Sequence, residues 1–222
     1  MPAMMRRRVD RLGRLACQVA YWCQPADGAP MVFASRYGDA TRSLALLGDL
    51  VRGEPLSPAG FGLSVHNAIS ALYSIAQGHT DNTVVVAGGR ASVAAALTEA
   101  AALLADGAPE VLVVYYEAPL PAGYAEFEDE PACEYAWAWR VALPEHSGHS
   151  GHPAQDGSAP LKLELSVDES GGIANPETAD WPAGLAVLRH VLQAAAARDT
   201  AAPAALLRHD RAGAQWTWSA HA

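Results

Sequence analysis

Apolar residues recur along this chain at two different spacings, which predict where helices and strands lie. Residues 5–23 repeat apolar side chains from Val9 to Ala20 every three or four positions, with the arginines largely on the other faces, as in an amphipathic helix. Three short, mostly apolar segments, at 31–35, 83–87 and 110–117, are typical of buried strands.

The segments between these strands predict helices with recognisable ends. After the first strand, Asp39 or Thr41 is a suitable N-cap for a helix that Gly53 ends. A further helix is expected at 91–105, after the Gly-Gly turn that follows the second strand, 83–87. Strands that alternate with helices predict right-handed β-α-β crossovers and an α/β fold with a mostly parallel sheet.

The segment between the first two strands also contains a loop and a second helix. Residues 54–62 are rich in proline and glycine and predict a loop, and residues 64–78 predict a helix that ends at Gly78. Four apolar residues are expected on or near the buried side of that helix: Ile69, Leu72, Tyr73 and Ile75.

The second half of the chain has a different pattern. A strand at 133–143 should carry Tyr135, Trp137 and Trp139 on one face, and the alternating segment 161–169 should form a hairpin with it. A helix is expected over 181–199 and a short strand at 214–222. Residues 144–160, which connect the segments 133–143 and 161–169, are a low-complexity stretch that predicts a flexible loop.

Composition and length indicate one domain, residues 1–222, in which 5–117 form the core and 161–222 add C-terminal strands and a helix. The 222 residues are 50% hydrophobic, without an internal repeat, and no apolar run reaches the ~18 residues that a bilayer span needs. The cysteines (Cys17, Cys23 and Cys133) are too few and scattered for a disulfide framework or a zinc site. We therefore expect a cytoplasmic protein.

The net charge of −9 is unevenly distributed. Residues 1–52 are basic and the rest of the chain is acidic, which excludes an extended nucleic-acid surface. The basic segment either meets an acidic partner or is a solvated helix face.

The Gly-Gly turn is the first candidate site. Gly88, Gly89 and Arg90 stand between a strand and a helix, where phosphate sites and nucleophiles often lie. The turn matches neither a dinucleotide fingerprint nor a phosphate-binding loop, and it lacks the Ser or Cys of a nucleophile elbow; Ser92 lies too far into the helix. The alternative is structural: the two glycines allow close packing or a positive φ angle.

Three further groups of polar residues are candidates. Ser64, His66 and Asn67 precede an apolar helix, where they could cap it, be buried or lie at an interface, or where His66 with Ser64 could act in a hydrolase. The histidines at 146, 149 and 152 (His146, His149, His152) have a spacing that permits metal binding, but their Ser-Gly spacers favour a flexible loop. The acidic run 126–130 is most simply a solvated loop. We expect no metal and no cofactor.

Five segments taken together carry a family resemblance: RRRVDRLGRLA, VFASRYGD, SPAGFGLSVHNAISALYSIAQG, TVVVAGGRASVAAALTEA and VLVVYYE. In this order they resemble the N-terminal half of a β-ketoacyl synthase, from about Arg6 to Glu117, with weaker similarity in the final Trp-rich strand. The chain is most similar to short "chain length factor" proteins of bacterial aryl-polyene and xanthomonadin-type pigment clusters.

The resemblance implies half of a thiolase-like fold, with a mixed, mostly parallel sheet flanked by helices and an added C-terminal β-hairpin and helix. It also implies that Gly88 occupies the position of the nucleophilic cysteine, so that no thioester can form there. His66 does not correspond to a catalytic histidine, because those histidines come from a C-terminal half that this chain lacks. The family's usual first strand has no counterpart here, so the sheet is expected to lack a strand or the start to be truncated.

The resemblance further implies a partner surface. In ketosynthases the strand before the cysteine pairs antiparallel with its twin across a two-fold axis, and here that strand contains Thr83, Val84, Val85 and Val86. We expect a homodimer or a heterodimer with an active ketosynthase. Acyl carrier proteins are acidic and could dock on the N-terminal arginines.

The leading functional hypothesis is therefore a non-catalytic accessory protein of fatty-acid or aryl-polyene-type biosynthesis. It would pair with a condensing enzyme or present a pocket that limits or stabilises the acyl chain. Two alternatives remain open: a small acyl-thioester hydrolase that uses His66, and a scaffold that binds a carrier protein or ketosynthase without an acyl pocket.

Overall fold

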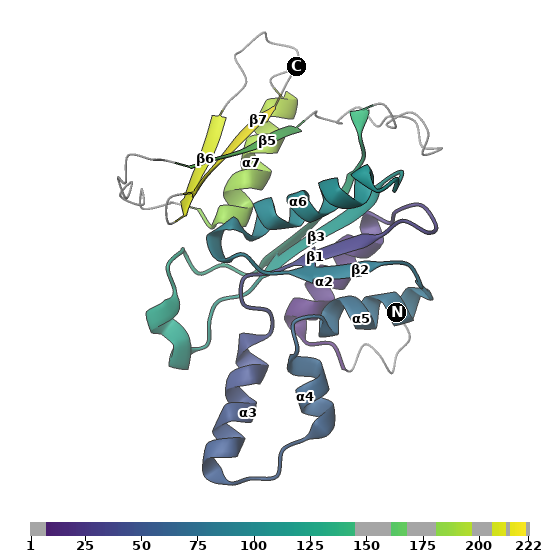
Figure 1. Ribbon diagram of the computed structural model, residues 1–222. Helices are drawn as coiled ribbons and strands as arrows, with labels where there is room; N and C mark the ends of the chain where they lie inside the picture. Colours follow the sequence, from purple (N-terminus) through teal and green to yellow (C-terminus); the bar gives the residue numbers. More distant parts are fainter. Residues whose placement is uncertain (1–7, 145–160, 168–180, 197–205, 212–213, 221–222) are drawn as a thin grey trace.

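The computed structural model describes residues 8–144, 161–167, 181–196, 206–211 and 214–220 (Figure 1). The α-helices are α2 (Arg11–Trp22), α3 (Ala40–Arg52), α4 (Pro58–Ser64), α5 (Ala68–Gln77), α6 (Ser92–Ala105) and α7 (Ala183–Ala196), and two 3-10 turns are η1 (Gly89–Ala91) and η2 (Ala122–Phe127). The strands are β1 (Met31–Ala34), β2 (Thr83–Val86), β3 (Val111–Glu117), β4 (Tyr135–Val141), β5 (Leu161–Val167), β6 (Leu206–Arg211) and β7 (Ala214–Ala220).

The main sheet has the strand order β2-β1-β3-β4. The strand β1 pairs in parallel with β2 on one side and β3 on the other, and β4 closes the sheet antiparallel to β3. This arrangement confirms the predicted α/β fold with a mostly parallel sheet. Every residue of β3 is buried, because helices cover both faces of this central strand.

Two hydrophobic cores lie on the two faces of the main sheet. Helices α2 and α5 cover one face, where Leu112 and Tyr116 of β3 contact Phe33 and Tyr73. Helix α6 covers the other face, where Val113 and the remaining odd-numbered residues of β3 are buried. The period-two alternation along β3 thus supplies both cores from one strand.

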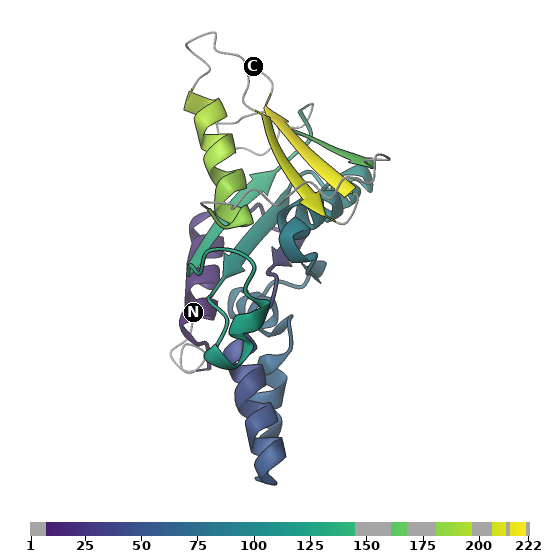
Figure 2. The same cartoon turned by 90° about the vertical axis from the view of Figure 1, so that its left-hand side faces the viewer.

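A second sheet, with the order β5-β7-β6 and antiparallel pairing throughout, lies together with α7 on the α6 side of the main sheet (Figures 1 and 2). Trp218 of β7 is buried in the same core as α6 and Val187 of α7. Gly184 of α7 lies directly on the ring of Tyr115, and its carbonyl accepts a hydrogen bond from Trp137 Nε1 at 3.2 Å. These contacts join the C-terminal unit to the main sheet.

The strand partners in the second half correct one prediction. We expected 161–169 to pair with 133–143, but β5 pairs with β7, and β4 pairs with β3. The aromatic face of β4 explains its position, because Trp137 stacks on Tyr115 of β3 with ring centroids 5.2 Å apart. The strand β6 was not predicted at all.

The segment between β1 and β2 also differs from the prediction. Residues 58–64 are helical and not a loop, because Ser57 Oγ accepts a hydrogen bond from Gly60 N at 3.1 Å and proline is tolerated in a first helical turn. The following helix begins only at Ala68, and Ile75 is exposed and not buried.

Other predicted helix ends agree with the structure. The carboxylate of Asp39 accepts from Arg42 N at the start of α3, and Gly53 ends that helix in the left-handed region with φ 69°. Helix α2 begins at Arg11, and Asp10 caps it, whereas residues 5–7 of the predicted segment 5–23 lie outside the described residues. Among the helices described, none is long and apolar enough to cross a membrane.

Candidate functional site

The strand β2 leads into a tight turn at the N-terminus of α6, where the resemblance places a nucleophile. Gly89 adopts a φ of +58°, which favours glycine, whereas Gly88 has a φ of −137° that other residues also adopt. A Cβ atom on Gly88 would lie 3.3 Å from Ala95 Cβ and 3.4 Å from the carbonyl of Ala91. The first glycine therefore permits close packing, and the second permits the turn.

The hydroxyl of Ser92 forms hydrogen bonds with the backbone of both glycines of this turn. Ser92 is fully buried at the start of α6; its Oγ accepts a hydrogen bond from Gly88 N at 2.9 Å and donates to Gly89 O at 2.7 Å. In an acyl-transferring elbow, a backbone N–H at this place would stabilise an oxyanion. Here that N–H is bonded to the chain's own side chain.

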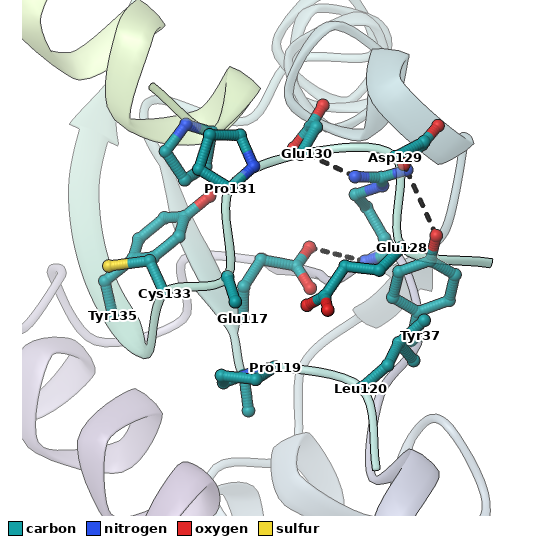
Figure 3. Close-up of a pocket in the computed structure, with 14 residues that line it drawn as sticks. Tyr37, Glu117, Pro119, Leu120, Glu128, Asp129, Glu130, Pro131, Cys133 and Tyr135 are labelled. Atoms are coloured by element: carbon teal, nitrogen blue, oxygen red, sulfur yellow. Dashed lines mark hydrogen bonds and ion pairs between the residues drawn. The ribbon is translucent and has the colours of Figure 1, made fainter. Parts of the chain in front are cut away.

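Arg90 extends from the turn to the acidic loop that precedes β4. Its Nε lies 3.0 Å from Asp129 Oδ2, and the same carboxylate forms an ion pair with Arg36, which follows β1. Arg36 Nη1 also lies 2.9 Å from Glu130 Oε2 (Figure 3). Burial alone would lower the pKa of Arg36, but Asp129 and Glu130 raise it.

The acidic run 126–130 is therefore not simply a solvated loop, as the sequence had indicated. The side chain of Glu130 is 10% exposed, and besides its ion pair it accepts a hydrogen bond from Ala183 N, at the first residue of α7, at 3.1 Å. A carboxylate at a helix N-terminus is electrostatically favourable. Through these ion pairs and this hydrogen bond, Asp129 and Glu130 connect the end of β1, the Gly88 turn and α7.

Glu117 is the last residue of β3 and lies beneath this network (Figure 3). Its Oε1 accepts from Arg36 N at 2.6 Å, and its Oε2 lies 3.4 Å from Ser35 Oγ. Burial raises the pKa of Glu117 to about 7, against the opposing effects of Arg36 and Tyr115. The adjoining cavity has a volume of about 30 Å³, room for a water molecule but not for an acyl chain.

Sequence reasoning missed this cluster, although a signal existed. Arg36 follows the first predicted strand, Arg90 follows the second, and acidic residues follow the third. The carboxyl ends of parallel strands meet at one edge of a sheet, so these opposite charges could have been expected to pair there.

His66 lies in the short connection between α4 and α5. Its ring packs against Gly38, where a Cβ atom would lie 2.8 Å from Nδ1. Burial lowers the pKa of His66, while the backbones of Val86 and Ser35 oppose that shift; no carboxylate of the described residues contributes. The structure thus places a partly buried His66 near the ends of β1 and β2.

The other two residues of this candidate group are not joined to His66 in a catalytic arrangement. Ser64 is the last residue of α4 and not part of α5, and its Oγ donates to Phe61 O at 2.8 Å. Asn67 occupies the N-cap position of α5 without a capping hydrogen bond from its side chain. Among the described residues, no contact joins Ser64 and His66 into a catalytic relay.

The predicted histidine-rich loop, with His146, His149 and His152, lies outside the described residues. Within the part of the chain that is described, no three His, Cys, Asp or Glu residues are arranged to hold a metal ion. The three cysteines are free thiols, and burial raises the pKa of Cys17 to about 12.

A larger cavity of about 430 Å³ lies where the N-termini of α2 and α3 approach each other. Its lining includes Asp10 and Asp39, the capping residues of those helices, and Glu134. Burial raises the pKa of Asp10, and the nearby Asp39 adds to that shift. The lining contains no residue of the Gly88 turn.

Three solved structures of ketosynthase assemblies share this fold. A chain from the complex of the ketosynthase ApeO with its chain length factor ApeC, from Xenorhabdus doucetiae, is 23% identical, with a TM-score of 0.74 over 99% of this chain and 81% of that one. A chain of the ishigamide ketosynthase/chain length factor is 19% identical, with a TM-score of 0.68 over 99% and 82%. A chain from the AntDE:AntF complex, a type II acyl carrier protein with its ketosynthase, is 10% identical, with a TM-score of 0.68 over 100% and 86%.

These similarities confirm the expected thiolase-like ketosynthase fold. No curated protein matches the chain significantly. The family described as "Beta-ketoacyl synthase, N-terminal domain" matches residues 1–219, nearly the whole sequence. The chain therefore belongs to the β-ketoacyl synthase N-terminal domain family.

Proposed function

We propose that this protein is a non-catalytic, chain-length-factor-like subunit that pairs with an active ketosynthase in aryl-polyene-type or related acyl-chain synthesis in the cytoplasm. The observation that carries the proposal is Gly88 at the elbow between β2 and α6. Glycine has no side chain, so it cannot form the thioester through which a condensing enzyme works.

The surroundings of Gly88 support the same conclusion. Ser92 Oγ holds the N–H of Gly88, and Asp129 pairs with Arg90 beside the turn. The small cavity beyond this network has too little volume for an acyl chain, and the larger cavity of about 430 Å³ is lined by no residue of the Gly88 turn. We therefore favour a role through pairing over a role in which this chain presents its own acyl pocket.

The edge of the main sheet supports the proposed pairing. The strand β2 (Thr83–Val86) stands at the end of the strand order, and no other described strand pairs with its outer edge. All four residues are only partly buried, although three are valines. An uncovered apolar edge strand is a site for pairing with another chain, and we assign Thr83–Val86 to the dimer seam.

A ketosynthase is the partner that we favour over a second copy. Two of the similar structures are named as ketosynthase and chain length factor pairs, and this chain has the matching fold. An acyl carrier protein is a further proposed partner. Exposed arginines at the start of α2 would contact it, although Arg11 already pairs with Glu134 at 2.5 Å.

The proposal is tested by intact-protein mass after incubation with acyl and malonyl thioesters. We expect no acyl adduct and no condensation product from the purified chain, and a complex when a ketosynthase from the same organism is added. Acylation or condensation by the chain alone would contradict the proposal. Thioester hydrolysis that disappears in His66→Ala would favour the hydrolase alternative instead.

A further inference from the structure

Helices α3 and α4 form a hairpin that extends away from the main sheet in both views (Figures 1 and 2). The two helices contact each other, yet neither contains a single buried residue. Helix α6, by contrast, buries seven residues over a similar length. The hairpin therefore contributes little to the core of this chain.

The exposed face of the hairpin is apolar. On α3, Leu47, Leu50 and Val51 recur at the three- and four-residue spacing that places side chains on one helix face, and they are 48%, 58% and 87% exposed. Leu56 in the connection, Phe61 in α4 and Val65, which directly follows α4, are also exposed. We call these six residues the hairpin patch.

The margins of the apolar face on α3 are covered, whereas its middle is not. Leu44 lies against Gly123 of η2, where a Cβ atom would be 2.8 Å from its side chain, and Leu46 lies near Gly60 of α4. Leu50 and Val51 lie on the same helix, and no described residue buries them. Large apolar side chains that are exposed together on one element in this way indicate an interaction site.

The charges around the patch indicate an apolar partner surface. Arg52, at the end of α3, pairs with Asp49 at 2.5 Å and with Glu54 at 2.9 Å, and Arg42 pairs with Asp39 at 2.8 Å. Both arginines of the hairpin are thus neutralised within it. An acidic carrier protein would need free positive charge here, so the surface fits a folded subunit with an apolar face.

The hairpin is also continuous with the edge that we assign to the dimer seam. Its C-terminal end leads into His66, whose ring lies near the backbone of Val86, the last residue of β2. The base of the hairpin and the outer end of β2 therefore lie close together. One partner can contact both.

We propose that the hairpin patch docks on the ketosynthase subunit and that residues 40–64 are ordered by that contact. This inference rests on the proposed function, since it names the surface through which the heterodimer forms. The patch would bury its six apolar side chains at the partner, in addition to the pairing of β2.

The test compares two equally exposed leucines. Leu50→Asp places a charge in the patch, whereas Leu192→Asp changes a leucine of α7 that is 59% exposed, against 58% for Leu50. With full-length protein and a ketosynthase from the same organism, we expect Leu50→Asp to weaken binding at least about tenfold and Leu192→Asp to leave it unchanged. Circular dichroism of each free variant should match the wild type.

Hydrogen exchange provides a second measurement on the unmutated chain. Amides of 40–64 should exchange fast in the free protein and slow at least about tenfold in the complex, while those of α6 stay protected in both. If the wild type binds the ketosynthase but Leu50→Asp binds equally well and 40–64 gain no protection, the inference is overturned and the proposed function stands. If the wild type does not bind a ketosynthase, both fail together.

Discussion

The carboxyl edge of the main sheet and the α3–α4 hairpin are neighbouring regions with opposite character. At the sheet edge, where an enzyme of this fold would perform chemistry, the chain satisfies its own groups: Ser92 holds Gly88, and Arg36 pairs with Asp129 and Glu130. At the hairpin, large apolar side chains are left uncovered. The elbow is therefore occupied by contacts within the chain, whereas the hairpin leaves apolar side chains exposed for the partner that we propose.

The largest expected effect comes from the arginine at the centre of the closed region. Arg36→Ala removes the guanidinium that pairs with Glu130, whose side chain is nearly buried, and with Asp129, which should lower the free energy of unfolding by about 3 kcal/mol. The matched change in the hairpin, Arg52→Ala, removes an exposed ion pair and should not measurably change stability. Urea denaturation of both variants measures the difference, and equal stabilities would contradict the contrast.

A pH profile examines the same region through Glu117. Its folded pKa of about 7 exceeds the ordinary value of 4.5, so the folded state holds the proton more tightly. The contribution of Glu117 to stability is therefore largest below about pH 4.5 and falls as the pH rises to about 7, by roughly 1 kcal/mol per pH unit at most.

Glu117→Gln removes this titration and keeps an oxygen that can accept from Arg36 N. We expect the stability of the variant, relative to the wild type, to rise between pH 5 and pH 7, as measured by urea denaturation at each pH. A difference that stays constant across this range would show that the carboxyl of Glu117 titrates normally.

A glycine packed against the main sheet and a glycine of the hairpin should respond in opposite directions to an added methyl group. A Cβ atom on Gly184 would lie 2.4 Å from the Tyr115 ring, so Gly184→Ala should destabilise the protein by roughly 1–3 kcal/mol. A Cβ atom on Gly62 in α4 meets nothing within 4 Å, and Gly62→Ala should be neutral or stabilise by about 0.5–1 kcal/mol. Thermal unfolding of the pair tests this, and a destabilised Gly62→Ala would mean that the hairpin is packed.

Much of the main sheet could be predicted from the sequence, because its signals are local. The continuous apolar runs of β1, β2 and β3, the Asp39 cap and the aromatic face of β4 were visible as patterns. Alternation along β5 predicted a strand and its exposed face but carries no information on its partner, so the pairing with β7 was missed.

The candidate site was less predictable, because its key contacts join residues far apart in the chain. Arg36 and Asp129 are 93 positions apart, and Arg90 and Asp129 are 39. Glu117 looked like the polar end of a strand, although it is buried there. The hairpin patch was hidden for another reason: an amphipathic pattern such as that of α3 predicts an apolar face but does not say whether this chain or another covers it.

The smallest expected change comes from restoring the nucleophile. Gly88→Cys adds a thiol at the elbow with only slight crowding against Ala95. We expect the variant to remain unacylated by acyl thioesters in intact-mass measurements, because Ser92 Oγ still bonds to the N–H of residue 88 and the nearby cavity of about 30 Å³ has no room for an acyl chain. Efficient acylation of Gly88→Cys would mean that the missing thiol alone prevents acylation at the elbow.

The most direct test of the central claim is a condensation assay with three samples: this chain alone, a ketosynthase from the same organism alone, and the two together. The account predicts no product from this chain alone and a higher yield or altered product length when the two are combined. Product formation by this chain alone, or an unchanged yield and length on mixing, would contradict it.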